Sequence, residues 1–220
     1  MIEVVAKLGG EMPGAPIDVV LKHPFGAADR VAASWLKRVF DIVVACLVLL
    51  LFCPLLLVIV IAIRLETGES ALVSQRRTGY RGRIFTLYRF RTFSTGGEAD
   101  PLRRVQLTFV GRMLLALSLD ELPQLWNVLK GDMSLVGPRP HEVSDDEAYV
   151  SLIGRYVERF RARPGLTGLA QISGLRGEAK AVELMRERIA ADNSYIDNWS
   201  FALDVTILVR TAAVLRDHQV

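Results

Sequence analysis

Two adjacent carboxylates, Asp120 and Glu121, lie in the hexapeptide LDELPQ that spans residues 119–124. Pro123 suits the first turn of a helix, where its missing N–H would have no partner in any case. This predicts Asp120 at or near the N-cap and Glu121 in the first turn, at the positive end of the helix dipole. The two acids could simply stabilise the helix, since aspartate is a favoured N-cap that contributes ~1 kcal/mol. The alternative is that they take part in a reaction, and the arginines of the chain favour it.

Several arginines lie where they could hold an anion. Arg139 sits between two prolines, each of which fixes its own φ near about −65°, so a guanidinium there loses little backbone freedom on gripping a phosphate. Alternation along residues 84–93 puts Arg89 and Arg91 on one face of a strand, either as a solvated face or as an anion clamp. The loop RPGLTGLAQISG (residues 163–174) has glycines that could serve only to make turns. Together with the carboxylates, these residues indicate a charged substrate.

The segment that must position this chemistry begins with an uncharged apolar run at residues 42–63. Its length is what a bilayer core demands of a helix. Pro54, preceded by Cys53, removes a backbone donor near the middle, and that loss is costly in lipid unless the helix breaks there or is compensated locally. We therefore expect a re-entrant helix-break-helix that dips into the membrane and returns, with a kinked single span as the alternative.

Both flanks of the apolar run are basic, so the positive-inside rule gives no orientation for a crossing helix and favours the re-entrant form. In the N-terminal flank, Trp35, Lys37 and Arg38 are of the types that suit the headgroup zone. The two cysteines, Cys46 and Cys53, lie within the run and are expected to be small buried hydrophobes.

The remaining pattern predicts an α+β, mainly helical fold. Residues 71–75 and 84–93 read as two strands of a small antiparallel hairpin or sheet around a turn at 78–82. A helix carrying an apolar stripe ends at Gly131, and two more cover 178–191 and 202–216. The last is apolar enough to lie on the bilayer as an interfacial amphipathic helix or to pack on the core. We expect three parts: a loose tail (1–33), a membrane-associated segment (34–64) and a catalytic domain facing the cytoplasm (65–220).

Composition excludes several function classes. The 220 residues carry a formal net charge of only +3, and no nucleic-acid-binding signature accompanies it, so no nucleic acid is expected as a partner. A mildly basic protein suits an anionic membrane surface instead. The three histidines are scattered and make no metal-binding pattern.

Four segments resemble the bacterial sugar transferases, also called monotopic phosphoglycosyl transferases, and in particular their compact members. They are QRRTGYRGRIFTLYRFRTF (75–93), SLDELPQLWNVLKGDMSLVGPRP (118–140), RPGLTGLAQISG (163–174) and YIDNWSFALD (195–204). The resemblance implies transfer of a sugar phosphate from a UDP-sugar to a polyprenyl phosphate such as undecaprenyl phosphate, with release of UMP. This would be the first membrane step of exopolysaccharide or surface glycan synthesis, on the cytoplasmic face of the bacterial inner membrane. Self-association into a homo-oligomer is left open.

The resemblance also implies roles for single residues. Asp120 matches the family's nucleophile, which forms a covalent phosphosugar intermediate, and Glu121 assists it with Mg²⁺ held by the two acids. An aspartate is already ionised at neutral pH and needs no base, but it must approach an anionic diphosphate. A cation and arginines would screen that repulsion, and Arg89, Arg91 and Arg139 are the candidates.

The sequence departs from the family pattern at several positions. Cys53 replaces the usual serine before Pro54, and Arg89 replaces a lysine. Leu115, Gln106 and Phe109 stand where the family has arginines, and Arg103, Arg104 or Arg112 could compensate. These losses keep open a second hypothesis, that of a weak or inactive relative acting as a membrane scaffold or partner subunit.

Overall fold

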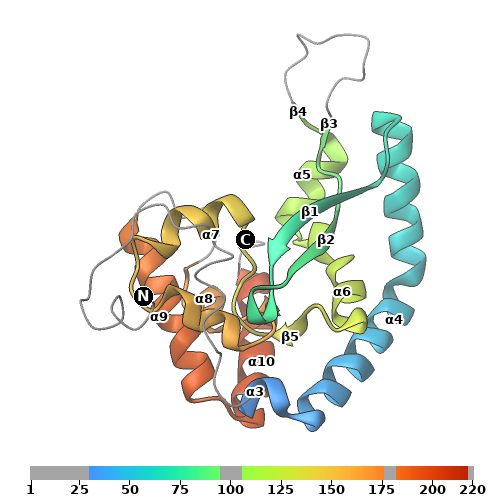
Figure 1. Ribbon diagram of the computed structural model, residues 1–220. Coiled ribbons are helices and arrows are strands. Elements are labelled where there is room, and N and C mark those ends of the chain that lie inside the picture. The colour runs from blue at the N-terminus through green and yellow to red at the C-terminus, as the bar shows by residue number, and fades with distance from the viewer. Residues whose placement is uncertain (1–29, 95–105, 176–181, 218–220) are drawn as a thin grey trace.

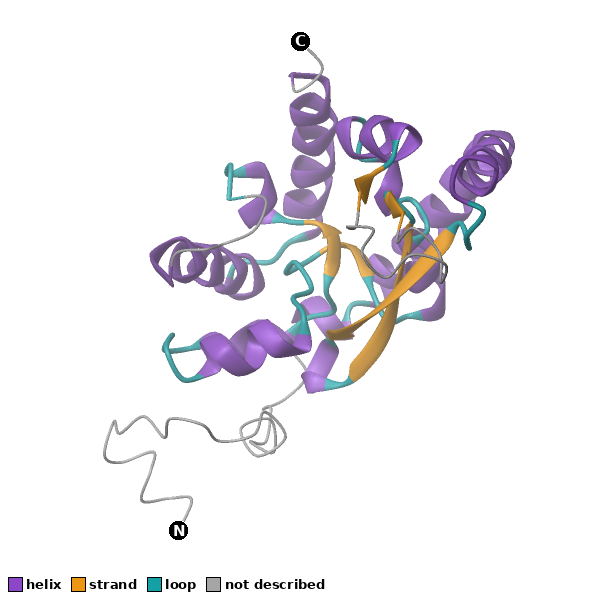
Figure 2. Ribbon diagram, turned by 90° about the horizontal axis from the view of Figure 1, so that it is seen from above, coloured by secondary structure: helices purple, strands orange, loops and turns teal. Residues whose placement is uncertain are grey.

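The computed structural model describes residues 30–94, 106–175 and 182–217, so the predicted N-terminal tail lies almost wholly outside the described residues. Within them the chain is mainly helical, as predicted, and short strands lie between the helices (Figure 1, Figure 2). The helices are α3 (Arg30–Ala33), α4 (Trp35–Thr67), α5 (Phe109–Ala116), α6 (Gln124–Lys130), α7 (Val143–Val150), α8 (Leu169–Ile172), α9 (Val182–Asp197) and α10 (Phe201–Asp217). The 3₁₀ helices are η1 (Tyr80–Gly82), η2 (Leu119–Glu121) and η3 (Tyr156–Arg161). The strands are β1 (Leu72–Thr78), β2 (Ile84–Phe90), β3 (Phe93–Ser94), β4 (Gln106–Leu107), β5 (Ser134–Val136) and β6 (Gly165–Thr167).

The apolar run forms the long helix α4. The Ser34 hydroxyl caps its start by accepting a hydrogen bond from the Lys37 backbone N–H at 3.2 Å, and Gly68 ends it in the left-handed region at φ 70°. The predicted break at Cys53 and Pro54 is not confirmed, because the helix runs through both residues. A proline removes one donor and bends a helix, and the neighbouring hydrogen bonds can carry the helix across it. In Figure 1, α4 changes direction between its blue N-terminal part and its turquoise C-terminal part.

Most of α4 faces outward. It is the one described helix that is long and apolar enough to cross a membrane, and only 11% of its most apolar 18-residue window is buried. Its buried residues gather toward the two ends and leave the middle bare: Lys37, Asp41, Ala45, Ile59 and Ile63. Cys46 and Cys53 are exposed, so the prediction that they are buried was wrong. The reason is that an apolar helix with so little protein around it has few inward positions to fill.

The predicted headgroup role of two cations was also wrong. The Lys37 ammonium donates hydrogen bonds to Asp204 Oδ2 in α10 at 2.7 Å and to the Val136 carbonyl at 3.0 Å, inside the domain. Arg38 donates from its two terminal nitrogens to the last carbonyls of α6, at 2.6 and 2.8 Å. Both side chains therefore join α4 to the rest of the fold, while Trp35 remains exposed.

The predicted hairpin is confirmed. β1 and β2 pair antiparallel with Leu72 opposite Phe90 and Thr78 opposite Ile84, and η1 closes the turn. The second strand ends at Phe90, three residues earlier than predicted. On its inner side Leu87 is buried in the main core, which brings the hairpin against α6.

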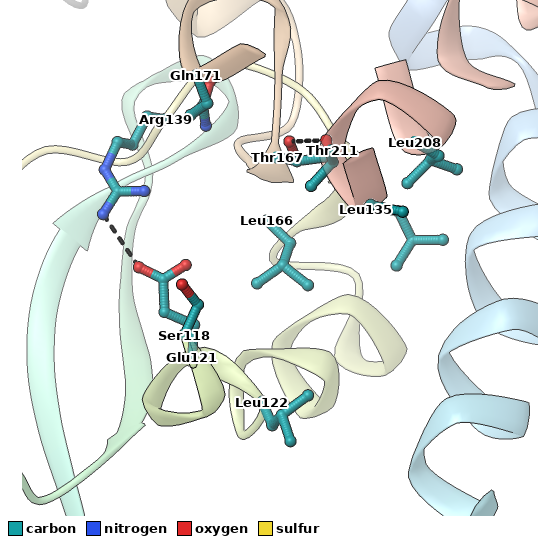
Figure 3. A pocket seen from close by; sticks show the side chains of 11 residues that line it. Ser118, Glu121, Leu122, Leu135, Arg139, Leu166, Thr167, Gln171, Leu208 and Thr211 are labelled. Carbon is teal, nitrogen blue, oxygen red and sulfur yellow. Dashed lines mark hydrogen bonds and ion pairs between the residues drawn. The ribbon is translucent and has the colours of Figure 1, made fainter. Parts of the chain in front are cut away.

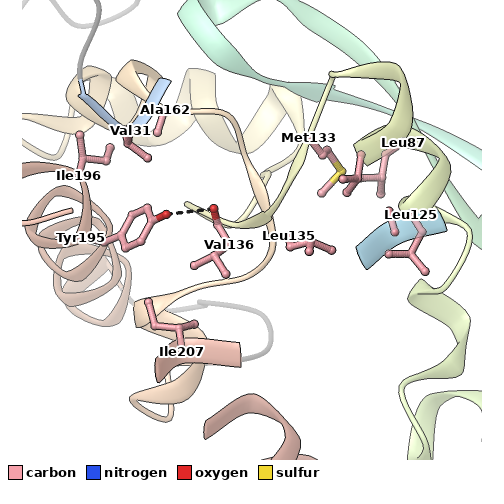
Figure 4. Close-up of a cluster of buried hydrophobic side chains, with 12 residues drawn as sticks. Val31, Leu87, Leu125, Met133, Leu135, Val136, Ala162, Tyr195, Ile196 and Ile207 are labelled. Carbon is pink, nitrogen blue, oxygen red and sulfur yellow. Dashed lines mark hydrogen bonds between the residues drawn. The ribbon is translucent and has the colours of Figure 1, made fainter. Parts of the chain in front are cut away.

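A parallel pair, β5 with β6, was not predicted. Each strand has three residues, too few for a periodic pattern to be recognised. The glycines explain how closely the two backbones approach, because a Cβ added at Gly165 would lie 2.0 Å from the Gly137 nitrogen. The main core surrounds this pair, with Val136 and Tyr195 in its centre and the Tyr195 hydroxyl donating to the Val136 carbonyl at 3.1 Å (Figure 4).

Candidate active site

The two carboxylates lie in η2, between α5 and α6. Ser118 precedes them with φ 54°, a left-handed conformation that turns the chain sharply before Asp120. The N-cap of α6 is Pro123, so Asp120, predicted at or near the N-cap, lies in the short 3₁₀ helix just before it. The turn at residues 119–121 adds a separate 3₁₀ helix that a sequence reading merges with the following helix.

Two arginines hold the acids. Arg89 Nη2 donates to Asp120 Oδ2 at 2.5 Å and to Glu121 Oε1 at 3.2 Å, and Arg139 Nη2 donates to the same Glu121 oxygen at 3.1 Å. The Asp120 side chain is only 4% exposed and that of Glu121 20%. Burial raises the pKa of Asp120 above its usual range, and the Arg89 guanidinium partly opposes that rise. The result is a buried carboxyl group paired with a specific cation.

The two arginines come from distant parts of the chain. Arg89 is on β2, which lies against η2. Arg139 follows β5, and its loop is held from behind because the buried Arg159 guanidinium donates to the Arg139 carbonyl. Asn127 of α6 further fixes the hairpin, since its amide donates to the Thr86 carbonyl at 2.7 Å and accepts from the Tyr88 N–H at 3.2 Å.

Two predicted anion-binding residues lie elsewhere. Arg91 donates to the Ser70 carbonyl at 2.7 Å and pairs with Glu69 at 2.7 Å, so it is not beside Arg89 as the strand alternation predicted. The alternation fails because β2 ends at Phe90. Arg112 is exposed on α5, where its guanidinium stacks over the Phe109 ring at 5.9 Å. The structure thus places Arg89 and Arg139 at the acids and leaves Arg91 and Arg112 away from them.

Two cavities share Glu121 in their linings. The larger cavity, of about 750 Å³, has Glu121 in its lining and, among other residues, four arginines: Arg77, Arg89, Arg139 and Arg188. The smaller, of about 420 Å³, has four leucines in its lining and also Glu121 and Arg139. In Figure 3, the Glu121–Arg139 ion pair lies at one side of this second cavity and Leu166 projects between it and Leu208. One cavity therefore suits a polyanion, the other an apolar chain, and both share one ion pair.

Sequence reasoning missed several lining residues of the larger cavity. Arg77 pairs with Glu142 at 2.9 Å, and the alternation of the first strand gave no reason to single it out. Arg188 comes from α9, far along the chain, and His141 follows the second proline of the Arg139 loop without any pairing pattern. Of the family departures, Leu115 lines this cavity, Phe109 is 63% exposed on α5, and Gln106 lies in β4. Arg103 and Arg104 lie outside the described residues.

Asp120 and Glu121 are also the predicted ligands of a Mg²⁺ ion. Among the described residues no group of three or more Asp, Glu, His or Cys side chains could hold a metal ion by itself. The arginine contacts engage Asp120 Oδ2 and Glu121 Oε1, which leaves the second oxygen of each carboxylate outside these ion pairs. Mg²⁺ in proteins often has only one or two carboxylate ligands, with substrate phosphates and water completing its shell. The adjacent acids fit that mode.

The sequence model of the family described as "Bacterial sugar transferase" matches residues 32–218. A Caulobacter vibrioides protein named UDP-glucose:undecaprenyl-phosphate glucose-1-phosphate transferase is 46% identical over 217 residues, which cover 94% of this chain and 81% of that protein. A Klebsiella pneumoniae protein of the same name is 40% identical over 206 residues, 91% of this chain but 43% of the relative. Exopolysaccharide production protein ExoY of Rhizobium meliloti is 38% identical over 204 residues, with coverage of 84% and 87%. With its carboxylates held between two arginines and a match over nearly its whole described length, the chain belongs to the bacterial sugar transferase family.

Proposed function

We propose that this protein transfers glucose 1-phosphate from UDP-glucose to undecaprenyl phosphate, with release of UMP. The observation that carries the proposal is the buried Asp120 carboxylate held by Arg89, next to a Glu121–Arg139 pair shared by a polar and an apolar cavity. The substrates come from the names of the Caulobacter and Klebsiella relatives.

The transfer proceeds in two steps through Asp120. In the first, a carboxylate oxygen of Asp120 bonds to the β-phosphorus of UDP-glucose while the bond from that phosphorus to the bridging oxygen breaks, and UMP leaves. In the second, an oxygen of undecaprenyl phosphate attacks the same phosphorus, and the aspartyl bond breaks to restore the carboxylate. The arginines of the polar cavity screen the charge of the diphosphate as the carboxylate approaches it.

The two cavities divide the substrates. The larger, polar cavity takes the nucleotide sugar, and the smaller cavity, with its four leucines, takes the first isoprenoid units of the lipid, so that both phosphates reach Arg139. Asp120 and Glu121 would hold Mg²⁺, which supplies neutralisation of the diphosphate when bound.

We place α4 in the cytoplasmic leaflet as a re-entrant segment rather than a full span. Its N-terminal part is joined to α10 through Lys37, and at its other end Glu66 accepts hydrogen bonds from the Phe109 and Val110 N–H groups of α5 at 2.6 and 3.0 Å. Both ends of the helix thus contact one polar domain, which supports their lying on the same side of the membrane. The bare middle of α4 is then the part that enters lipid.

Topology is tested with single-cysteine variants. With both native cysteines replaced by alanine, Trp35→Cys and Leu65→Cys place a thiol at exposed sites toward the two ends of α4. A membrane-impermeant maleimide added to inside-out vesicles should label both variants, and added to intact spheroplasts it should label neither. Labelling of one variant from each side would mean that the helix spans the membrane.

The activity is tested with purified protein, UDP-glucose and undecaprenyl phosphate. Wild type should release UMP, and mass spectrometry after incubation with UDP-glucose alone should find a hexose phosphate on Asp120. Asp120→Asn should lose both signals while keeping the wild-type melting temperature. UMP release by Asp120→Asn at the wild-type rate would eliminate Asp120 as the nucleophile, and a wild type inactive with every UDP-sugar would favour the scaffold hypothesis.

A further inference from the structure

A buried guanidinium lies directly behind the loop that carries Arg139. Arg159, in η3, has a side chain that is only 2% exposed. Its Nη2 donates to the Arg139 carbonyl and to Asp192 Oδ2 of α9, the latter at 3.0 Å. Its Nη1 donates to His141 Nδ1, two residues beyond Arg139. One side chain therefore grips the loop on both sides of Pro140.

Two buried acids, Asp192 and Asp146, also contact the Arg159 guanidinium. Asp192 is 1% exposed and Asp146 of α7 is fully buried, with Asp146 Oδ1 at 3.5 Å from Arg159 Nη1. The Tyr156 hydroxyl donates to that same Asp146 oxygen at 2.6 Å and lies 3.0 Å from His141 Nδ1. α7, η3 and α9 are thus all tied to the loop through one cation.

Burying such a cluster is costly, and apolar side chains of similar volume often stabilise a protein at least as well. What a charged network adds is the fixed geometry of its hydrogen bonds. A guanidinium is a rigid planar fork that can bind a backbone carbonyl and two side chains in fixed directions, whereas an ammonium on a flexible stem cannot.

We propose that Arg159 is a positioning residue that sets Arg139 for both steps of the transfer. It fixes the backbone on which the Arg139 guanidinium stands, 3.1 Å from Glu121 and in the lining of both cavities. This inference rests on the proposed function. Because Arg139 lines the two cavities, displacing it should weaken the binding of the sugar nucleotide and of the lipid phosphate together. Substitution of a residue that lines only the polar cavity would weaken only the binding of the sugar nucleotide.

The test is a double-mutant cycle between Arg159→Lys and Arg139→Gln. Arg159→Lys keeps the buried charge but loses the fork, and we expect KM to rise about tenfold for both UDP-glucose and undecaprenyl phosphate, with a smaller change in kcat. In the Arg139→Gln background the same substitution should have little further effect, because its target is gone. Unchanged KM values, or an equal effect in both backgrounds, would overturn the proposal.

A second pair of variants covers the case in which Arg159→Lys does not fold. In His141→Asn the amide oxygen can accept from Arg159 in place of Nδ1, whereas His141→Phe offers no acceptor. His141 lines the polar cavity, so the two variants are compared with each other, and the KM for undecaprenyl phosphate is the decisive value. We expect both KM values to be higher in His141→Phe than in His141→Asn; equal values would count against a positioning role for Arg159.

UMP binding to wild type and to these variants, measured by calorimetry, needs no turnover. A wild type that binds UMP but releases none from UDP-glucose refutes the proposed function. In that case weaker UMP binding by Arg159→Lys would still support the positioning role, and equal binding would refute it.

Discussion

Arg89 is the residue whose removal gives the sharpest test of the site. In Arg89→Gln, Asp120 loses its only described cation partner at 2.5 Å, and Glu121 loses one of its two. Hydrogen bonds to charged groups contribute about 1.5–3 kcal/mol, which corresponds to about 10- to 150-fold in kcat/KM. We therefore expect kcat/KM for UDP-glucose to fall by about that factor at neutral pH.

The pH dependence gives an independent readout. Burial raises the pKa of Asp120, and Arg89 opposes the rise, so removing Arg89 should raise that pKa further. A protonated carboxyl is not a nucleophile, and more of the enzyme is protonated at any given pH when the pKa is higher. The acid side of the activity profile should therefore move to higher pH in Arg89→Gln and stay near wild type in Arg89→Lys, which keeps the charge.

The assay is UMP release across a pH series, with Arg91→Gln as the matched control. Arg91 lies two residues further along and pairs with Glu69 instead of the acids, so its loss should leave the acid limb in place. The reasoning would be refuted by an Arg89→Gln profile that keeps its acid limb. It would also be refuted by a loss of activity no larger than that of Arg91→Gln.

Two stability predictions concern how the fold is held together. Lys37→Met leaves Asp204 as a buried charge without its cation and should lower the free energy of unfolding by about 3–5 kcal/mol, measured by thermal unfolding in detergent. The control, Lys130→Met, removes an ion pair with Asp132 that is partly exposed, and it should lower the free energy of unfolding by less than about 1 kcal/mol. Equal losses in the two variants would contradict the argument. Gly165→Ala should lower the melting temperature, because its Cβ would lie 2.0 Å from a backbone nitrogen in the loop after β5. Gly154→Ala, where nothing lies within 4 Å, is the control and should leave it unchanged.

Local patterns in the sequence predicted local structure well. Alternation and a glycine turn gave the β1–β2 hairpin, because side chains on a strand have a period of two. The helix ending at Gly131 was found because glycine takes the left-handed conformation at a C-terminus, here with φ 89°. The hexapeptide drew attention to the two acids that the fold sets against Arg89 and Arg139, although their local geometry differs from the prediction.

Long-range pairing was beyond the sequence. Lys37 next to an apolar run resembles a headgroup cation, and only the fold reveals Asp204, 167 residues away, as its partner. Arg89 and Arg91 have the same residue type and the expected strand face, yet the end of β2 between them sends one to the acids and the other to Glu69. Which partner each arginine finds depends on the residue at which β2 ends, and the alternation of side chains along the sequence does not predict that residue.

The shared ion pair leads to a kinetic prediction. Glu121 and Arg139 line both cavities, so the two anionic phosphates cannot both occupy that position at once. On the proposed function we therefore expect UMP to leave before undecaprenyl phosphate reacts, so double-reciprocal plots against UDP-glucose at several lipid concentrations should be parallel. A high concentration of undecaprenyl phosphate should inhibit the enzyme competitively with UDP-glucose. Arg139→Gln should weaken that inhibition and raise both KM values. Intersecting lines would mean that both substrates bind together, in which case the ion pair does not separate the two steps.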